Sequence, residues 1–204
     1  MKYDLIIVAR SASRELIRVT ENCIDSAKQD KADLNIIVVE TTTFAVNYDA
    51  EIIRYKDGFN YNRALNLGLE YAKGDIHILA NNDLIFHKGW SIIGESMIVN
   101  GFPSASALST YYLQRGFQRG NWIYPGYEIG RHLTGWCIFA TKECIAKIGR
   151  LDESYEFWFS DDMYAHQLIK ADIKHGLFCN VQVDHILSAT LRTLSRQEQR
   201  KYIR

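Results

Sequence analysis

Long apolar runs, prolines and paired cysteines are scarce in this 204-residue sequence. No apolar stretch approaches the roughly 20 residues that a membrane-spanning helix needs. Only 2 prolines are present, and no low-complexity tract or internal repeat is visible, which disfavours a linker or a repeat protein. The cysteines show no C-x-x-C spacing, so a zinc site is not expected, and each lies in or beside an apolar stretch, as buried thiols do. They are Cys23, Cys137, Cys144 and Cys179.

An excess of charge of one sign is also absent. Lys plus Arg number 24 and Asp plus Glu number 24, so net charge argues neither for nor against a nucleic-acid partner. The N-terminus, Met1-Lys2-Tyr3-Asp4, leads directly into an apolar run without a signal-peptide pattern. We therefore expect a cytoplasmic protein.

Short apolar runs alternate with amphipathic stretches along most of the chain, which is typical of a parallel sheet with crossover helices. Expected strands cover 4–9, 34–39, 50–55, 76–80, 135–140 and 181–185. Expected helices cover 14–28, 61–73, 91–99, 141–149 and 160–171, with N-caps at Ser13, Asn60, Thr141 and Ser160. The pattern predicts one α/β domain over 1–186, with a Rossmann-like, mainly parallel sheet flanked by helices.

The apolar run 76–80 is followed at once by Asn81, Asn82 and Asp83. Ligands of open α/β sheets bind beyond the carboxyl ends of such strands. One carboxylate and two amides there suit Mg²⁺ or Mn²⁺, which binds through few carboxylates plus substrate phosphates. The alternative is a simple turn, because Asn and Asp dominate turns.

Three other segments have both a functional and a structural interpretation. Asn62, Arg63 and Asn66, at the start of the helix 61–73, predict an anion or sugar pocket or else a solvated face. Asp161 and Asp162 are either site carboxylates or first-turn acids that stabilise a helix. The stretch 100–134, rich in Gly, Tyr, Arg and Trp, predicts an irregular functional segment or a folded-back hairpin with an aromatic mini-core.

The C-terminal segment 187–204 is expected to form a basic helical tail. Four arginines spaced four residues apart would form one stripe, which is either a solvated face or a contact for a diphosphate or a nucleic-acid backbone. They are Arg192, Arg196, Arg200 and Arg204.

Several pieces of the sequence, in this order, resemble the family 2 glycosyltransferases, which have the GT-A fold. They are NYNRALNLG at 60–68, Asn81-Asn82-Asp83, Gly135-Trp136, IGRLDE at 148–153, Phe159-Ser160-Asp161-Asp162 and Asp184-His185. The first two resemble the helix before the metal motif and the D-x-D motif. Gly135-Trp136 and IGRLDE together resemble the G-x…iGxfDE segment. The last two resemble the Glu-Asp catalytic pair and the late metal-binding histidine. The resemblance covers about residues 4 to 185.

The resemblance implies a metal-dependent, inverting transfer of a hexosyl or pentosyl group from a nucleotide-diphosphate sugar to an acceptor hydroxyl. The expected acceptor is a glycan or, as in similar bacteriophage enzymes, a hydroxylated base of modified DNA. A bacteriophage protein would work in the host cytoplasm. Asp83 is the implied principal ligand of Mn²⁺ or Mg²⁺, and His185 is the second.

The resemblance also implies a role for each remaining site residue. Asp161 is the implied base, with Asp162 as the alternative, and Trp136 and Trp158 would flank the sugar or the acceptor. Glu40 would contact the nucleoside. The donor-side residues are Ala9, Arg10, Glu40, Asn62, Arg63, Asn66, Asn81, Asn82 and Trp136.

Three positions depart from the family pattern. Asn81 replaces the first acid of the metal motif, Ser160 replaces the glutamate of the catalytic pair, and Arg10-Ser11 replaces a proline-containing turn. Asn81 and Ser160 leave open a non-catalytic sugar-nucleotide-binding or interaction module. A nucleotidyltransferase is a third hypothesis, although the loop after the first strand lacks the glycines such enzymes use.

Overall fold

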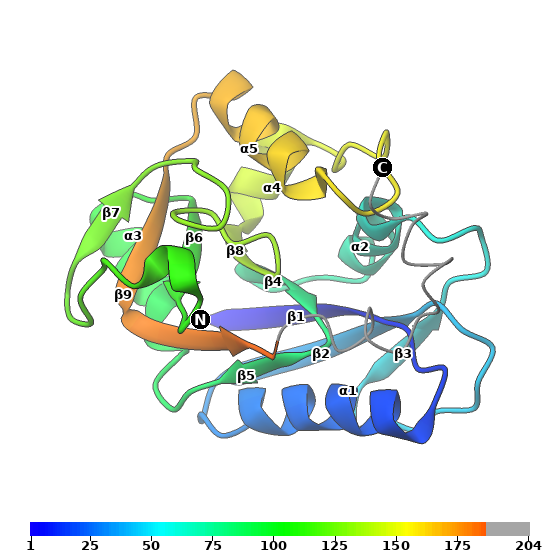
Figure 1. Cartoon of the computed structure of the whole chain (residues 1–204). Helices are drawn as coiled ribbons and strands as arrows, with labels where there is room; N and C mark the ends of the chain where they lie inside the picture. The colour runs from blue at the N-terminus through cyan, green and yellow to red at the C-terminus, as the bar shows by residue number, and fades with distance from the viewer. Residues whose placement is uncertain (187–204) are drawn as a thin grey trace.

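The computed structural model describes residues 1–186. The predicted basic tail 187–204, with its arginine stripe, lies outside the described residues. The described part is one α/β domain built on a nine-stranded mixed sheet, as the sequence predicted. Figure 1 shows the sheet between two layers of helices.

The strand order is β3-β2-β1-β4-β8-β6-β9-β5, with β7 also paired to β9. The strands are β1 (Lys2–Ala9), β2 (Asp33–Glu40), β3 (Glu51–Arg54), β4 (Ile76–Asn81), β5 (Leu84–Phe86), β6 (Ser104–Leu108), β7 (Ile123–Pro125), β8 (Cys137–Thr141) and β9 (His175–His185). The helices are α1 (Arg14–Ala27), α2 (Tyr61–Leu69), α3 (Ile92–Asn100), α4 (Lys142–Ile148) and α5 (Ser160–Lys170), with a 3₁₀ turn over Tyr112–Gln114.

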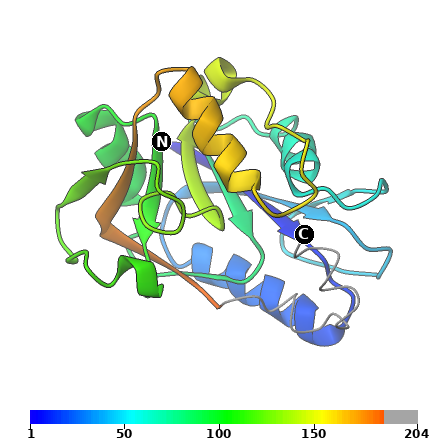
Figure 2. The ribbon, with the colours of Figure 1, turned by 45° about the horizontal axis from the view of Figure 1, so that its top comes forward.

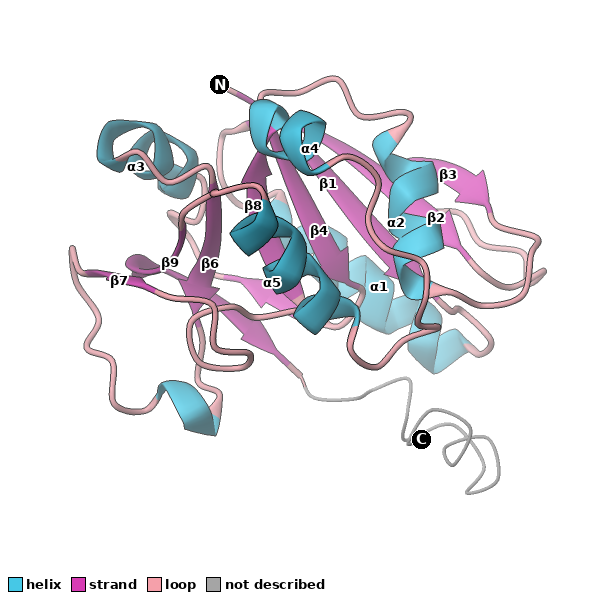
Figure 3. Ribbon diagram, turned by 90° about the horizontal axis from the view of Figure 1, so that it is seen from above, coloured by secondary structure: helices cyan, strands magenta, loops and turns pink. Residues whose placement is uncertain are grey.

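The central parallel strands β2, β1 and β4 are apolar on both faces because helices cover both, and β3 pairs with β2 at the edge of the sheet. Along β1, Leu5 and Ile7 pack with α1 and α3, whereas Ile6 and Val8 pack with α2, α4 and α5. This alternation is the two-residue period of a strand. Figure 3 shows α2, α4 and α5 over one face of the strands, with α1 on the other.

The helix boundaries follow local capping chemistry. Ser13, Asn60 and Thr141 each accept a hydrogen bond from a backbone N–H of the first turn, as predicted. The predicted cap at Ser160 is wrong, because Phe159 is the N-cap residue of α5 and Ser160 is its first helical residue. The Ser160 hydroxyl instead donates to the Phe157 carbonyl. Helix α2 also ends earlier than predicted, at Leu69.

The stretch 100–134 is more regular than the sequence predicted. It contains β6, a fully buried strand, and β7. Ser104 and Ser106 of β6 hid it from an apolar pattern, yet both hydroxyls are buried and hydrogen-bonded to His175 of β9. The aromatic mini-core of the alternative interpretation is present, where Phe117 and Tyr124 pack beside Leu108.

Strand β9 is longer than the predicted 181–185 and changes partners along its length. Its first half pairs with β6 and β7, and its end pairs with β5. A register shift opposite Ala107 and Leu108 accompanies the bend visible in Figure 2. The bend carries the end of β9 to the edge where the sequence predicted the site. Across residues 1–186, no helix is long and apolar enough to cross a membrane.

Candidate functional site

Three parallel strands deliver predicted site residues to one edge of the sheet. Ala9, at the end of β1, is in register with Glu40, at the end of β2. Val8 is in register with Asn81, at the end of β4. Arg10 follows Ala9 and is partly exposed. Ala9, Arg10, Glu40 and Asn81 therefore lie at one edge of the sheet, because carboxyl ends of parallel strands share an edge, and their contact with a donor stays a prediction.

The antiparallel pairing of β5 with β9 joins Asp83 to His185. Leu84, directly after Asp83, is in register with His185, and the Ile186 N–H donates to the Asp83 carbonyl at 2.9 Å. Nε2 of His185 lies 2.9 Å from Oδ1 of Asp83, and 3.4 Å from Nδ2 of Asn81. Both side chains are mostly buried, at 12% and 5% exposed. The structure thus brings together the two residues predicted as metal ligands.

An aromatic stack holds the imidazole of His185 in place. Trp136 lies parallel to it, with ring centroids 5.2 Å apart and an interplanar angle of 11°. Tyr111 packs edge-on against Trp136 at 4.9 Å. Trp136, which directly precedes β8, therefore contacts the predicted metal site. Because its ring is packed between His185 and Tyr111, it has little room to reorient toward a sugar.

The loop that carries Tyr111 is fastened by Asp184, which the sequence pairs with His185. Asp184 Oδ1 accepts the Thr110 N–H at 2.8 Å, and its Oδ2 accepts from His87 and Gln182. These hydrogen bonds lower the pKa of Asp184 in spite of its partial burial. Sequence reasoning gave Asp184 no role beyond its place next to His185. The alternation of Asp184 and His185 on a strand was the signal that they point to different partners.

Asn82 points away from the edge. Its amide donates 3.0 Å to the Thr20 hydroxyl of α1, and its side chain is buried. This hydrogen bond anchors the turn after β4 to α1, so the Asn82 amide has a structural role. A direct contact between Asn82 and a donor stays a prediction.

Glu40 is fully buried and organises the loops after β1 and β2. Its Oε1 accepts the backbone N–H groups of Ser11 and Thr42, each at 3.0 Å, and the Thr42 hydroxyl at 2.8 Å. Its Oε2 is buried without a hydrogen-bond partner among the described residues. Buried carboxylate oxygens are usually paired, so Oε2 is an acceptor that a ligand at this edge can satisfy.

Helix α2 uses its predicted site residues to hold the loop 151–153. Asn66 exchanges hydrogen bonds with both backbone groups of Leu151, each at 2.9 Å. Asn62 donates to the Asp152 carbonyl at 2.7 Å. Arg63 forms an ion pair with Glu153 at 2.8 Å. These contacts join the NYNRALNLG and IGRLDE segments of the sequence, and a further contact of Asn62, Arg63 or Asn66 with a donor stays a prediction.

Asp161 lies at the start of α5, directly over Gly135. A Cβ atom on Gly135 would stand 2.6 Å from both Cβ and Oδ2 of Asp161, so only glycine leaves room for that carboxylate. Burial raises the pKa of Asp161, and repulsion from Asp162 raises it further. Asp162 itself is exposed. A half-buried carboxylate with a raised pKa is the kind of group that serves as a general base.

Asp161 lines a small pocket with the phenol of Tyr61. The cavity is about 10 Å³, close to the space of one water molecule, and its walls come from α2, β4, β8 and α5. They are formed by Tyr61, Asn62, Leu65, Leu79, Gly135, Ile138, Leu151, Ser160, Asp161 and Tyr164. The Tyr61 hydroxyl is buried with no described hydrogen-bond partner. Burial raises the pKa of Tyr61, and smaller electrostatic contributions from Cys137, Asp161 and Asp83 raise it further.

Sequence reasoning missed Tyr61. It lies between Asn60 and Asn62 in a segment that the sequence singled out for its amides, and an aromatic residue at a helix start gives no chemical signal. Its place beside Asp161 depends on tertiary packing, which brings the start of α2 against the start of α5.

Asp83 and His185 are the residues that can hold a divalent cation. An octahedral ion with ligand distances of about 2.1 Å separates adjacent ligand atoms by about 3.0 Å, close to the 2.9 Å between Oδ1 and Nε2. Mg²⁺ binds through one or two carboxylates together with substrate phosphates, so this pair fits such an ion only jointly with a diphosphate. Within residues 1–186, no group of three or more His, Cys, Asp or Glu side chains forms a metal site without a substrate.

Solved structures with similar folds include two glycosyltransferases. GalNAc-T7, crystallised with UDP, GalNAc and Mn²⁺, has a TM-score of 0.67 and 10% identity over 90% of this chain and 43% of its own. TarS from S. aureus, residues 1–349, has a TM-score of 0.67 and 13% identity over 91% of this chain and 60% of its own. The chain therefore has the GT-A fold and spans about half the length of these two structures. No protein-family model and no curated protein matches the sequence.

Proposed function

We propose that this protein is a divalent-metal-dependent glycosyltransferase that moves a sugar from a nucleotide diphosphate to an acceptor hydroxyl with inversion. The observation that carries the proposal is the meeting of Asp83 and His185 at 2.9 Å, at the carboxyl edge of a GT-A sheet. The half-buried Asp161 over Gly135 supports the same proposal. The solved GalNAc-T7 structure with UDP and Mn²⁺ shows that a chain of this fold holds such ligands.

Asp83 and His185 would hold Mn²⁺ or Mg²⁺ together with the donor diphosphate. The ion, when bound, would neutralise the charge that develops on the leaving diphosphate. Trp136 keeps the imidazole face fixed, so that Nε2 points at Asp83. The buried Oε2 of Glu40 would accept a hydrogen bond from the nucleoside.

Asp161 would take the proton from the acceptor hydroxyl. The acceptor oxygen forms a bond to the anomeric carbon while the bond from that carbon to the diphosphate oxygen breaks. The proton moves to the Asp161 carboxylate, and the electron pair of the broken bond leaves with the diphosphate. Attack opposite the leaving group inverts the anomeric carbon.

A non-catalytic sugar-nucleotide-binding module is the second candidate. Asn81 and Ser160 favour it, because these positions carry acids in the resembling family. Such a module would bind the donor without turning it over, with or without the Asp161 carboxylate.

The test is a titration of the full chain with a panel of nucleotide-diphosphate sugars, in Mn²⁺ or in EDTA, by heat of binding and slow donor hydrolysis. We expect one donor to bind only with the metal, and Asp83→Ala to lose that binding. Asp161→Asn should keep donor binding and lose turnover. Donor binding without any turnover in the native chain would favour the module, and no binding to any donor would overturn both proposals.

A further inference from the structure

Three large aromatic side chains are exposed on the loop 154–159, which we name the aromatic loop. Tyr155, Trp158 and Phe159 are 44%, 42% and 52% exposed. The loop ends at Phe159, which stands two positions before Asp161. Clustered exposed aromatic surface in a soluble domain commonly marks a binding site.

The aromatic loop is anchored from below. Phe157 packs against Phe59 and edge-on against Tyr61, with ring centroids 6.1 and 5.8 Å apart. The Tyr61 N–H donates to the Glu156 carbonyl at 2.7 Å. The loop is thus fixed to the start of α2, which also lines the pocket of Asp161.

The exposed rings are presented at a cost in backbone energy. Phe159 has a φ of 68°, in the left-handed region, which bulky residues rarely adopt. Its ring lies 5.6 Å from that of Tyr155, and Trp158 packs edge-on against Phe157 at 5.2 Å. The rings therefore support one another instead of entering the core.

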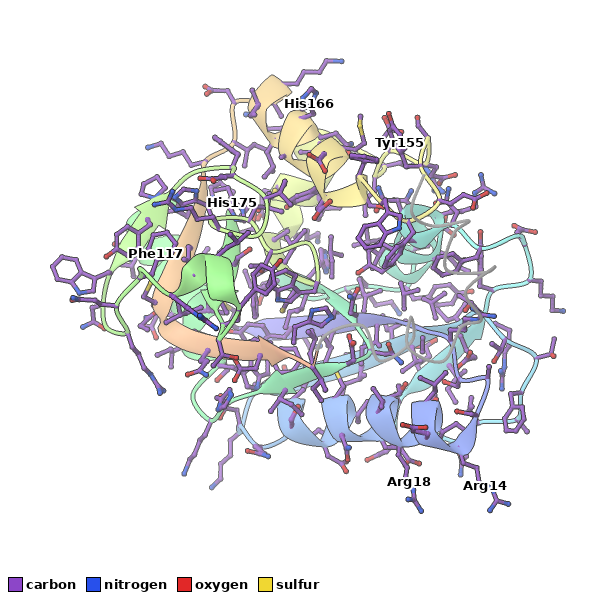
Figure 4. All side chains as sticks on the ribbon, viewed as in Figure 1. Arg14, Arg18, Phe117, Tyr155, His166 and His175 are labelled. Atoms are coloured by element: carbon purple, nitrogen blue, oxygen red, sulfur yellow. The ribbon has the colours of Figure 1, made fainter. Side chains whose placement is uncertain are left out.

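The charge around the aromatic loop selects against anionic partners. Residues 152–162 contain five acids and no Lys or Arg. Within residues 1–186, Glu153 is the one of these acids that forms ion pairs with arginines, namely Arg63 and Arg150. The exposed Arg14 and Arg18 lie on the opposite side of the molecule from Tyr155 of the aromatic loop (Figure 4). A polyanion such as DNA would be repelled here, because phosphate binding requires cations.

We propose that the aromatic loop is the acceptor subsite and that it takes a neutral saccharide. Pyranose rings carry apolar C–H faces that stack on aromatic rings, while their hydroxyls remain free to reach a neighbouring carboxylate. Tyr155, Trp158 and Phe159 would supply the stacking surface, and Asp161 would receive the proton of the reacting hydroxyl. This inference rests on the proposed function, and it selects the glycan acceptor over modified DNA.

The test compares neutral oligosaccharides with DNA on the full chain, with a metal and the donor identified above present. The probes are gluco-, manno- and N-acetylhexosamine oligosaccharides and duplex DNA with hydroxymethylated cytosine. For each probe, the heat of binding and the transfer of sugar to it are measured. Trp158→Ala removes a stacking ring, and Phe159→Gly removes another while relieving the left-handed backbone. Trp122→Ala, at an exposed tryptophan beside β7, is the matched control.

We expect one neutral oligosaccharide to bind and to accept sugar. Trp158→Ala and Phe159→Gly should each weaken its binding by about fivefold or more, with donor binding unchanged. Trp122→Ala should bind as the native chain does. Transfer to DNA alone, or equal effects of Trp158→Ala and Trp122→Ala, would overturn this inference while the donor result still supports the proposed function.

Discussion

Nε2 of His185 lies 2.9 Å from Oδ1 of Asp83 because the three-residue strand β5 pairs with residues 183–185 at the end of β9. The contact joins the turn after β4 to the end of the described chain. It is fixed by backbone pairing on one side and by the Trp136 stack on the other. A ligand pair held in this way is preorganised, so a bound ion would not have to order two free side chains.

Removal of the Asp161 charge should stabilise the protein at neutral pH. Burial raises the Asp161 pKa, so the folded carboxyl holds its proton at pH values where the unfolded chain has lost it. Stability therefore falls as pH rises from the ordinary aspartate pKa through the raised one, and the penalty is present above that window.

We expect Asp161→Asn to raise the denaturant midpoint at pH 7 and to abolish donor turnover. At pH 3, where both states are protonated, the gain in stability should be absent. Asp25→Asn, at an exposed position of α1, is the control and should leave the midpoint nearly unchanged. A lower midpoint for Asp161→Asn at pH 7 would contradict the raised pKa.

Asp162 should set the pH at which turnover begins. Repulsion from Asp162 is the second cause of the raised pKa of Asp161, after burial. Asp162→Asn should therefore move the acidic limb of the kcat/KM profile to lower pH, because the base then ionises more readily. The measurement is donor turnover across pH 4 to 8 (a range chosen around the aspartate pKa of about 4), and an unmoved limb would mean that Asp161 is not the base.

Gly135→Ala should impair chemistry by displacing Asp161. The added Cβ would lie 2.6 Å from both Cβ and Oδ2 of Asp161, so the start of α5 must shift together with the carboxylate. A misplacement of about 1 Å can reduce turnover by about 100-fold, and we expect a loss of tenfold to 100-fold in kcat. Gly116→Ala, where nothing lies within 4 Å of the added atom, is the control. Full activity of Gly135→Ala would remove Asp161 from the reaction.

Asn66→Ala should strongly destabilise the chain. Asn66 is buried, and its loss leaves both backbone groups of Leu151 unpaired. Two buried unsatisfied groups predict a loss of about 2–4 kcal/mol in the free energy of unfolding. Asn100→Ala removes one exposed side-chain hydrogen bond and is the control. Equal midpoints for the two variants in urea would show that the Leu151 loop does not depend on Asn66.

The sequence was sufficient for the parallel half of the fold. Apolar runs such as 76–80 can be satisfied only by burial on both faces, and Ser13 and Asn60 mark helix starts by local hydrogen bonds. It was not sufficient for β6, where Ser104 and Ser106 are buried because His175, 71 and 69 residues away, supplies their hydrogen bonds. No local pattern contains that information.

The same division applies to the candidate site. The sequence by itself determined that Ala9, Glu40 and Asn81 share an edge, since parallel strands end on the same side. Only the tertiary structure decided that His185 faces Asp83, that Asn82 turns toward α1 and that Tyr61 shares a pocket with Asp161. The physical reason is that strand ends follow from local periodicity, whereas side-chain partners follow from non-local register and packing.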